Sequence, residues 1–298
     1  MKIGLDIGGT KIAGALFGED RREILHKVIP IPKDYPGLLA SCADIVAQLD
    51  GQGGKGASIG IGIAGIIDAA KGSVDAANIP YMMGHPFRDD LQKAVDHSVR
   101  LANDAACAAL AEALDGAGKG HRSVFLLILG TGVGGAQVID GQMIENTAGM
   151  AGEVGHRPLP YREPEDGPAV ACACGLAGCI DKSASGPALA RLYKHVTGRD
   201  IEDAQHVVKS LAKGDDDARR VMDRYYTVLA KAASAILDDF DPGVIVVSGG
   251  LMVLPGLYDE VPKRWARYAD KPNIKTPFIP AALGPMSGLW GAAMVGVR

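Results

Sequence analysis

Two turns rich in glycine and threonine most constrain what this chain can fold into. DIGGTK at 6–11 and GTGVGG at 130–135 each follow a short apolar run and lead into a second one. Each segment therefore predicts a tight hairpin after a buried strand. The order of strand, turn, second strand and later helix occurs twice, about half a chain apart. This weak internal repeat predicts two related halves that face each other across a cleft.

The rest of the chain alternates strand-like with helical segments, which predicts an α/β fold. Strands are expected at 2–7, 12–17, 24–31, 57–63, 98–102, 123–129, 133–139 and 244–248. Helices are expected near 36–50, 105–115, 184–196, 216–239, 255–269 and 286–297. The interruption DGAGKGHR predicts a hinge near 117–122, between a small N-terminal lobe over 1–118 and a large lobe over 119–285. The C-terminal helix, about 286–298, is expected to pack back on the first lobe.

Composition narrows the class of protein. Hydrophobic residues at 47% and charged residues at 22% fit a globular α/β protein. A net charge of −4 with no stripe of Lys and Arg argues against nucleic-acid binding. The longest apolar runs, such as VFLLIL at 124–129, are far below the ~20 residues of a membrane helix. The opening MKIGLDIGGTK lacks the pattern of a secretory signal, so a reducing cytoplasm is the expected location.

The first glycine-threonine turn has the chemistry of a phosphate cradle. Gly8 and Gly9 let backbone amides approach an anion, while Thr10 and Lys11 add a hydroxyl donor and a positive charge. The alternative is an ordinary tight turn with a surface lysine. GTGVGG repeats the design, which favours a nucleoside triphosphate. The glycine pair that ends VIVVSGGL at 244–251 could border the nucleoside or simply form a strand-to-helix turn.

LANDAACAALAEA at 101–113 joins a strand to a helix. Asn103 or Asp104 would serve there as the helix N-cap. The functional alternative places Asp104 at the carboxyl end of the strand, facing the cleft, as a general base for a hydroxyl proton. Such a base typically contributes ~10²–10⁴ in rate.

A cluster of cysteines predicts a metal site. Cys172, Cys174 and Cys179 lie within eight residues, and His156 lies upstream in GEVGH at 152–156. Thiolate and imidazole ligands suit Zn²⁺ in a tetrahedron. Four protein ligands leave no open position, so a structural zinc is favoured over a zinc hydrolase. Glu153 is carried on the same loop as His156, whose second ring nitrogen could meet a substrate hydroxyl.

Taken together, the motifs resemble those of the ROK family of sugar kinases. They are DIGGTK, AANIP at 76–80, LANDA at 101–105, GTGVGG, GEVGH and CACGLAGCID at 172–181. The likeness covers the whole chain and is closer to bacterial N-acetyl-D-glucosamine kinases than to fructokinases. It implies an actin-like ATPase (ribonuclease H-like) fold with two lobes around a central cleft. It also implies a homodimer, and DNA binding is not expected because the phosphate strand begins at Lys2.

The resemblance implies transfer of phosphate from MgATP to the 6-hydroxyl of N-acetyl-D-glucosamine, giving N-acetylglucosamine 6-phosphate, with Asp104 as base. The sugar-binding residues it implies are Gly65, Asn78, Asn103, Asp104, Glu153, His156 and Asp181. The nucleotide-binding residues it implies are Asp6, close to magnesium, and Gly8, Gly9, Thr10, Lys11, Thr131, Gly132, Gly249 and Gly250. Asp181 stands where the family usually has Glu, which bears on substrate preference. The alternatives are a glucokinase or fructokinase of the same family and a non-catalytic sugar-sensing paralogue.

Overall fold

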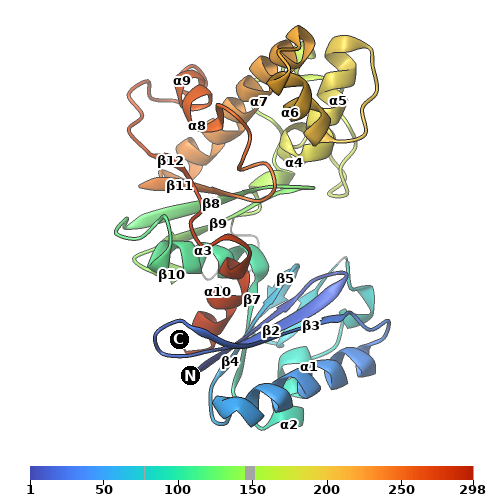
Figure 1. Cartoon of the computed structure of the whole chain (residues 1–298), viewed down its shortest axis with the longest axis vertical. Coiled ribbons are helices and arrows are strands. Elements are labelled where there is room, and N and C mark those ends of the chain that lie inside the picture. Colours follow the sequence, from blue (N-terminus) through green and yellow to red (C-terminus); the bar gives the residue numbers. More distant parts are fainter. Residues whose placement is uncertain (77, 145–151, 298) are drawn as a thin grey trace. The chain divides into compact units, whose positions relative to one another are not determined.

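The computed structural model describes residues 1–76, 78–144 and 152–297 (Figure 1). The chain divides into two compact units. The first unit comprises Met1–Gly120, Val138–Ala151 and Leu283–Arg298, and the second comprises His121–Gln137 and Gly152–Ala282. Part of the AANIP motif, at residue 77, lies outside the described residues.

The first unit is built on a five-stranded sheet. Its order is β3 (Glu23–Pro30), β2 (Lys11–Phe17), β1 (Lys2–Ile7), β4 (Ile59–Ile63) and β7 (Val99–Asn103). The first three strands are antiparallel, whereas β1, β4 and β7 run parallel. The register pairs Ile7 with Ile63 and Ile63 with Asn103. The carboxyl ends of the three parallel strands therefore lie level at one edge, where open α/β sheets bind their ligands.

Helices cover both faces of this sheet. Ile3, Leu5 and Ile7 pack with Leu38 and Ile45 of helix α1 (Tyr35–Leu49) in one buried cluster. On the other face, α10 (Ser287–Gly296) contacts β1, β4 and α3 (Asp104–Asp115). The indole N–H of Trp290 in α10 donates to Asp115 at 2.9 Å. The last helix of the chain thus belongs to the first unit.

Several short elements of the first unit had no counterpart in the sequence prediction. They are β5 (Ile66–Asp68), β6 (Ser73–Asp75), α2 (Phe87–Val95), the 3-10 helix Pro80–Met82 and the π-helical turn Asp50–Gly54. The strands β5 and β6 have three residues each, too few for a period-2 pattern to be recognised.

The second sheet has the order β10 (Gln142–Met143), β9 (Val133–Ile139), β8 (Ser123–Leu129), β11 (Val244–Ser248) and β12 (Phe278–Pro280). The second unit adds helices α4 (Ile180–Ala184), α5 (Gly186–Thr197), α6 (Ala204–Ala212), α7 (Asp216–Phe240), α8 (Leu257–Glu260) and α9 (Pro262–Trp265). Short 3-10 helices span Val154–His156 and Pro164–Asp166; a further one, Gly284–Met286, precedes α10.

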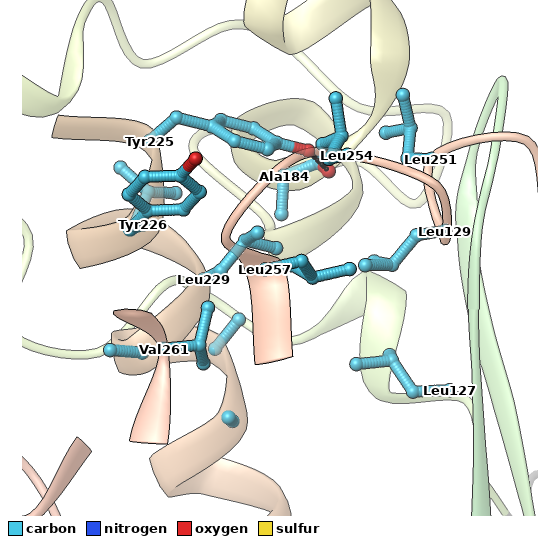
Figure 2. Packing of buried hydrophobic residues seen from close by; sticks show 14 of the residues in the cluster. Leu127, Leu129, Ala184, Tyr225, Tyr226, Leu229, Leu251, Leu254, Leu257 and Val261 are labelled. Atoms are coloured by element: carbon cyan, nitrogen blue, oxygen red, sulfur yellow. Dashed lines mark hydrogen bonds between the residues drawn. The ribbon is translucent and has the colours of Figure 1, made fainter. Parts of the chain in front are cut away.

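The core of the second unit lies between its sheet and the long helix α7. Leu127 and Leu129 of β8 belong to the same buried cluster as Tyr225 and Leu229 of α7. Figure 2 shows the Tyr225 side chain reaching Ala184, the last residue of α4. The Tyr225 hydroxyl donates to the Ala184 carbonyl oxygen at 2.5 Å. This contact fixes the short helix α4 against α7.

Two predicted helices are broken in the structure. The expected helix over 255–269 is divided into α8 and α9 at Pro262, which has no N–H to donate and stands at the first position of α9. The expected helix over 184–196 begins only at Gly186, because Ser185 has extended backbone angles between α4 and α5. Among the described residues, no helix combines the length and apolar character required to span a membrane.

Candidate active site

Asn103 and Asp104 occupy the junction between β7 and α3. The Asn103 side chain caps the helix, since its Oδ1 accepts from the backbone N–H groups of Ala105 at 2.9 Å and Ala106 at 3.2 Å. Its Nδ2 donates to the Gly65 carbonyl at 3.2 Å. The capping role that the sequence left open thus falls to Asn103. One carboxylate oxygen of Asp104, Oδ1, accepts from Ala105 N–H at 2.8 Å.

Asp6 and Asp104 form a pair of interacting acids in the first unit. The pKa of Asp6 is raised from 3.8 to about 6, chiefly by burial and next by the charge of Asp104, against the lowering effect of Lys11. Burial also raises the pKa of Asp104, against the lowering effect of backbone hydrogen bonds. Two carboxylates in a partly desolvated site favour a proton or a cation between them. The pair therefore offers both a strengthened base and an oxygen ligand for a divalent cation.

The DIGGTK turn lies beside this pair. Gly8 N–H donates to the Lys11 carbonyl at 3.0 Å, which closes the turn between β1 and β2. Gly9, Thr10 and Lys11 are exposed. A Cβ placed on Gly9 would lie 3.1 Å from the Cβ of Asn78, so the turn and the start of the NIP segment are neighbours. Gly65 joins these residues through its hydrogen bond with Asn103, and Asn78 joins them through its contact with Gly9.

The GTGVGG turn of the second unit is held by backbone hydrogen bonds. Gly130 N–H donates to the Gly132 carbonyl at 2.9 Å, and the Gly130 carbonyl accepts from Gly186 N–H at 2.8 Å. Thr131 and Gly132 are exposed at the tip. Leu251 N–H donates to the carbonyl of Leu129 at 3.0 Å, so the Gly249–Gly250 pair lies beside the strand that leads into the turn.

The GEVGH segment packs on the same turn. Gly155 lies so close to Val133 that a Cβ would stand 1.9 Å from the Val133 carbonyl oxygen and 3.6 Å from the Cβ of Asp181. Asp181 Oδ1 accepts from Val133 N–H at 2.8 Å, and its Oδ2 is paired with Lys182 Nζ at 2.9 Å. Glu153 is half-buried and His156 is exposed. The carboxylate of Asp181 is thus in contact with protein groups at both oxygens.

The cysteine loop gathers the four predicted metal ligands in two close pairs. Cys172 Sγ lies 3.4 Å from His156 Nδ1, and Cys174 Sγ lies 3.5 Å from Cys179 Sγ. The ligand atoms of His156, Cys172 and Cys174 all lie within 4.8 Å of one another. Ligands of a tetrahedral zinc are separated by about 3.3–3.8 Å, given Zn–N and Zn–S bonds of about 2.0–2.3 Å. The donor set therefore fits Zn²⁺, and the two close pairs have this spacing, whereas Cys179 lies outside the group of three.

The thiols of this loop influence one another's ionisation. Burial, followed by hydrogen bonds with Cys174 and Cys172, raises the pKa of Cys179 to about 12. A backbone hydrogen bond from Leu176 is the main cause that lowers the pKa of Cys174. Adjacent thiols resist ionising together unless a positive charge compensates them.

Two features near the site were missed from the sequence. The first is Lys182, which forms an ion pair with Asp181. In the sequence the two residues are merely adjacent, and adjacency alone does not predict an ion pair. The other is a groove of about 740 Å³ along the β5–β6 hairpin, lined by Ile66, Val74 and Met83 among others. It begins one residue after Gly65, and it was missed because neither strand was predicted.

Known proteins resemble this chain over its full length. The ROK family model matches residues 2–297. N-acetyl-D-glucosamine kinase of Yersinia pseudotuberculosis serotype IB (strain PB1/+) is 37% identical over 304 residues, covering 99% of this chain and 98% of the relative. N-acetyl-D-glucosamine kinase of Aliivibrio salmonicida is 36% identical over 303 residues, covering 100% of both chains.

Solved structures agree with the family match. A ROK hexokinase from Thermus thermophilus superimposes with a TM-score of 0.86 at 33% identity, covering 100% of this chain and 98% of that one. A ROK family glucokinase from Streptomyces griseus, in complex with glucose and AMPPNP, gives a TM-score of 0.76 at 29% identity and covers 99% of both chains. The resemblance and the α/β fold expected from the motifs are thereby confirmed. The chain belongs to the ROK family and has its actin-like ATPase fold.

Proposed function

We propose that this ROK-family sugar kinase transfers the terminal phosphoryl group of ATP to the 6-hydroxyl of N-acetyl-D-glucosamine, giving N-acetylglucosamine 6-phosphate. The observation that carries the reaction is the Asp6–Asp104 pair at the carboxyl edge of the first sheet, with the pKa of Asp104 raised by burial. The sugar is proposed from full-length relatives at 35–37% identity that bear this name.

Asp104 is proposed as the general base. A carboxylate whose pKa is raised accepts a hydroxyl proton more readily than an ordinary one. Because Asn103 supplies the helix cap, Asp104 has an oxygen other than the one bonded to Ala105 N–H for this task. Gly65, Asn78 and Asn103 are proposed as the sugar-binding residues of the first unit.

Glu153 and His156 are proposed as the sugar-binding residues of the second unit. The loop that carries them packs on the GTGVGG turn at Gly155 and Val133, so the proposed sugar-binding loop adjoins the proposed nucleotide site. Asp181 is left out of this sugar-binding set because its two oxygens contact Val133 and Lys182.

Nucleotide binding is proposed at the two glycine-threonine turns and at the Gly249–Gly250 pair. Gly8, Gly9, Thr10 and Lys11 would bind the phosphates from one unit, and Thr131 and Gly132 from the other. Asp6 would hold Mg²⁺, which when bound neutralises charge on the phosphates. Little covalent work is required of the protein in phosphoryl transfer, so positioning and one base suffice. We infer that the two compact units act as the two lobes of the kinase.

Zinc is proposed as a structural ion held by His156, Cys172, Cys174 and Cys179. The four donors complete its coordination and leave no position for substrate. Its proposed task is to fix the loop that carries Glu153 and His156. The cytoplasmic location and the homodimer remain predictions; sedimentation of the purified protein tests the second.

The alternatives are a glucokinase or hexokinase of the same family and a non-catalytic sugar sensor. Hexokinase and glucokinase structures resemble this chain at 33% and 29% identity, which keeps glucose as the second candidate. The test is ADP release by purified protein with MgATP and, in turn, N-acetylglucosamine, glucose, fructose, mannose and N-acetylmannosamine. N-acetylglucosamine should give the highest kcat/KM. A higher value with glucose would support the second candidate, and no turnover with any sugar would support the sensor.

Asp104→Asn tests the assignment of the base. The variant should fold and bind sugar, with kcat lowered by about 10²–10⁴. Asp96→Asn, at the C-terminal cap of α2, is the matched control and should keep its activity. Undiminished turnover in Asp104→Asn would contradict the assignment.

A further inference from the structure

Asp181 lies at the point where three segments of the second unit meet. It belongs to the first turn of α4, two residues after Cys179 of the cysteine loop. Its Oδ1 accepts from the backbone N–H of Val133, the residue that follows the tip of the GTGVGG turn, at 2.8 Å. Its side chain is only 13% exposed, so this hydrogen bond is largely shielded from water.

The approach of this carboxylate depends on the glycine at position 132. A Cβ on Gly132 would stand 2.8 Å from Asp181 Oδ1, closer than a side chain can come without displacing one of the two. The turn and the carboxylate are therefore fitted to each other. A longer acid at position 181 would have to push the turn away or fold back on itself.

Some backbone groups of the turn are hydrogen-bonded within the protein, and others face solvent. Gly130 N–H, both the Gly130 and Gly132 carbonyls and Val133 N–H have partners within the protein. In the described parts of the chain, no backbone partner is seen for the N–H groups of Thr131 and Gly132, and both residues are exposed. These two amides are the ones that remain available to an anion.

A carboxylate beside an anion-binding turn would oppose the anion unless its charge were compensated. Lys182 Nζ lies 2.9 Å from Asp181 Oδ2 and provides that compensation. Arg191 donates to the Lys182 carbonyl at 2.8 Å, which fixes the backbone of the same helical turn. The acid can therefore bind Val133 N–H without repelling phosphate from Thr131 and Gly132.

We propose that Asp181, with Lys182 as its counterion, is a positioning residue that holds the GTGVGG turn in its phosphate-binding shape and couples it to the cysteine loop. This inference rests on the proposed nucleotide role of the turn. It gives Asp181 a task different from the sugar contact that the resemblance implies for this position.

The test compares the effect of each substitution on KM for ATP with its effect on KM for the sugar. In Asp181→Ala the Val133 N–H loses its acceptor, and KM for ATP should rise about tenfold or more while KM for the sugar changes less than about twofold. Asp181→Asn retains an oxygen acceptor and should have a smaller effect than Asp181→Ala. Lys182→Met, which leaves the carboxylate uncompensated, should also raise KM for ATP. Asp200→Asn, an exposed acid paired with Lys194 in the same unit, is the matched control and should change neither KM.

Titration calorimetry with MgADP makes the inference independent of the sugar. Weaker MgADP binding by Asp181→Ala than by the parent supports it even if no sugar in the panel is phosphorylated, an outcome that would defeat only the proposed function. An increase of KM for the sugar with unchanged MgADP affinity would overturn the inference and return Asp181 to sugar binding. If Asp181→Ala does not fold, Asp181→Asn and Lys182→Met decide by the same criterion.

Discussion

Asp6→Asn should make the protein more stable near neutral pH and less active. The structure puts the pKa of Asp6 at about 6 against an ordinary 3.8, with burial as the largest cause and the charge of Asp104 as the second. Between pH 3.8 and about 6, Asp6 keeps its proton in the folded state but has lost it in the unfolded state. Protonated Asp6 therefore stabilises the fold below pH 4, and this contribution is lost as pH rises through 6.

The size of the effect follows from the two pKa values. A difference between 3.8 and about 6 corresponds to about 3 kcal/mol at pH 8, where Asp6 is fully ionised. Asparagine resembles the protonated acid and carries no charge at any pH. The free energy of unfolding of Asp6→Asn should therefore exceed that of the parent by up to about 3 kcal/mol at pH 8, with little difference at pH 4.

Urea unfolding without added magnesium at pH 4.5, 6 and 8 measures this difference, because magnesium would bind the ionised acid and hide its cost. Asp44→Asn, an exposed acid on α1, is the control and should follow the parent at each pH. The kinase activity of Asp6→Asn should fall, since the proposed magnesium ligand is lost. A variant less stable than the parent at pH 8, or a gain that does not shrink at pH 4.5, would refute the reasoning.

Two further predictions concern the second unit. Lys231→Met should lower the free energy of unfolding by about 3 kcal/mol, because fully buried Lys231 Nζ lies 2.8 Å from a carboxylate oxygen of equally buried Asp166, which would lose one of its cations. Adding Asp166→Asn to this variant should recover part of the lost stability. Urea unfolding at pH 7 measures the single and the double variant, and a loss below about 1 kcal/mol in Lys231→Met would contradict the prediction. Cys174→Ser should abolish stoichiometric zinc in metal analysis and weaken sugar binding, whereas Cys42→Ser, on the buried face of α1, should leave the zinc content unchanged. Full activity in a sample verified to lack zinc would count against the structural role.

The sequence predicted long elements well and short ones poorly. Strands such as β1 and β8 are largely apolar segments that each end at a glycine, and α7 has a strong helical period, so local pattern is enough to identify them. Elements of three residues, such as β5 and β6, form only because the surrounding fold holds them. Their local sequences carry too little signal to be recognised.

The site shows a similar division. Residue types predicted a base, phosphate turns and metal ligands, but the choice between Asn103 and Asp104 as helix cap required the positions of the backbone N–H groups. Asp181 reaches a backbone N–H that lies 48 positions away, and Lys231 bonds an acid 65 positions away. Contacts between residues so distant in sequence have no local signature, so the sequence could predict the chemistry of these side chains but not their partners.

The cysteine loop links the proposed sugar-binding segment of the second unit to its proposed phosphate-binding turn. His156 belongs to GEVGH, and Cys179 stands two residues before Asp181, whose carboxylate holds Val133 N–H. Helix α4, which carries Asp181, is fixed at its other end by Tyr225. An ion bound by His156 and the cysteines would therefore immobilise both ends of this connection. Loss of zinc should raise KM for the sugar and for ATP together, whereas loss of the Asp181 carboxylate alone should raise only KM for ATP; a zinc-free protein with a selective defect toward one substrate would show that the loop serves that side alone.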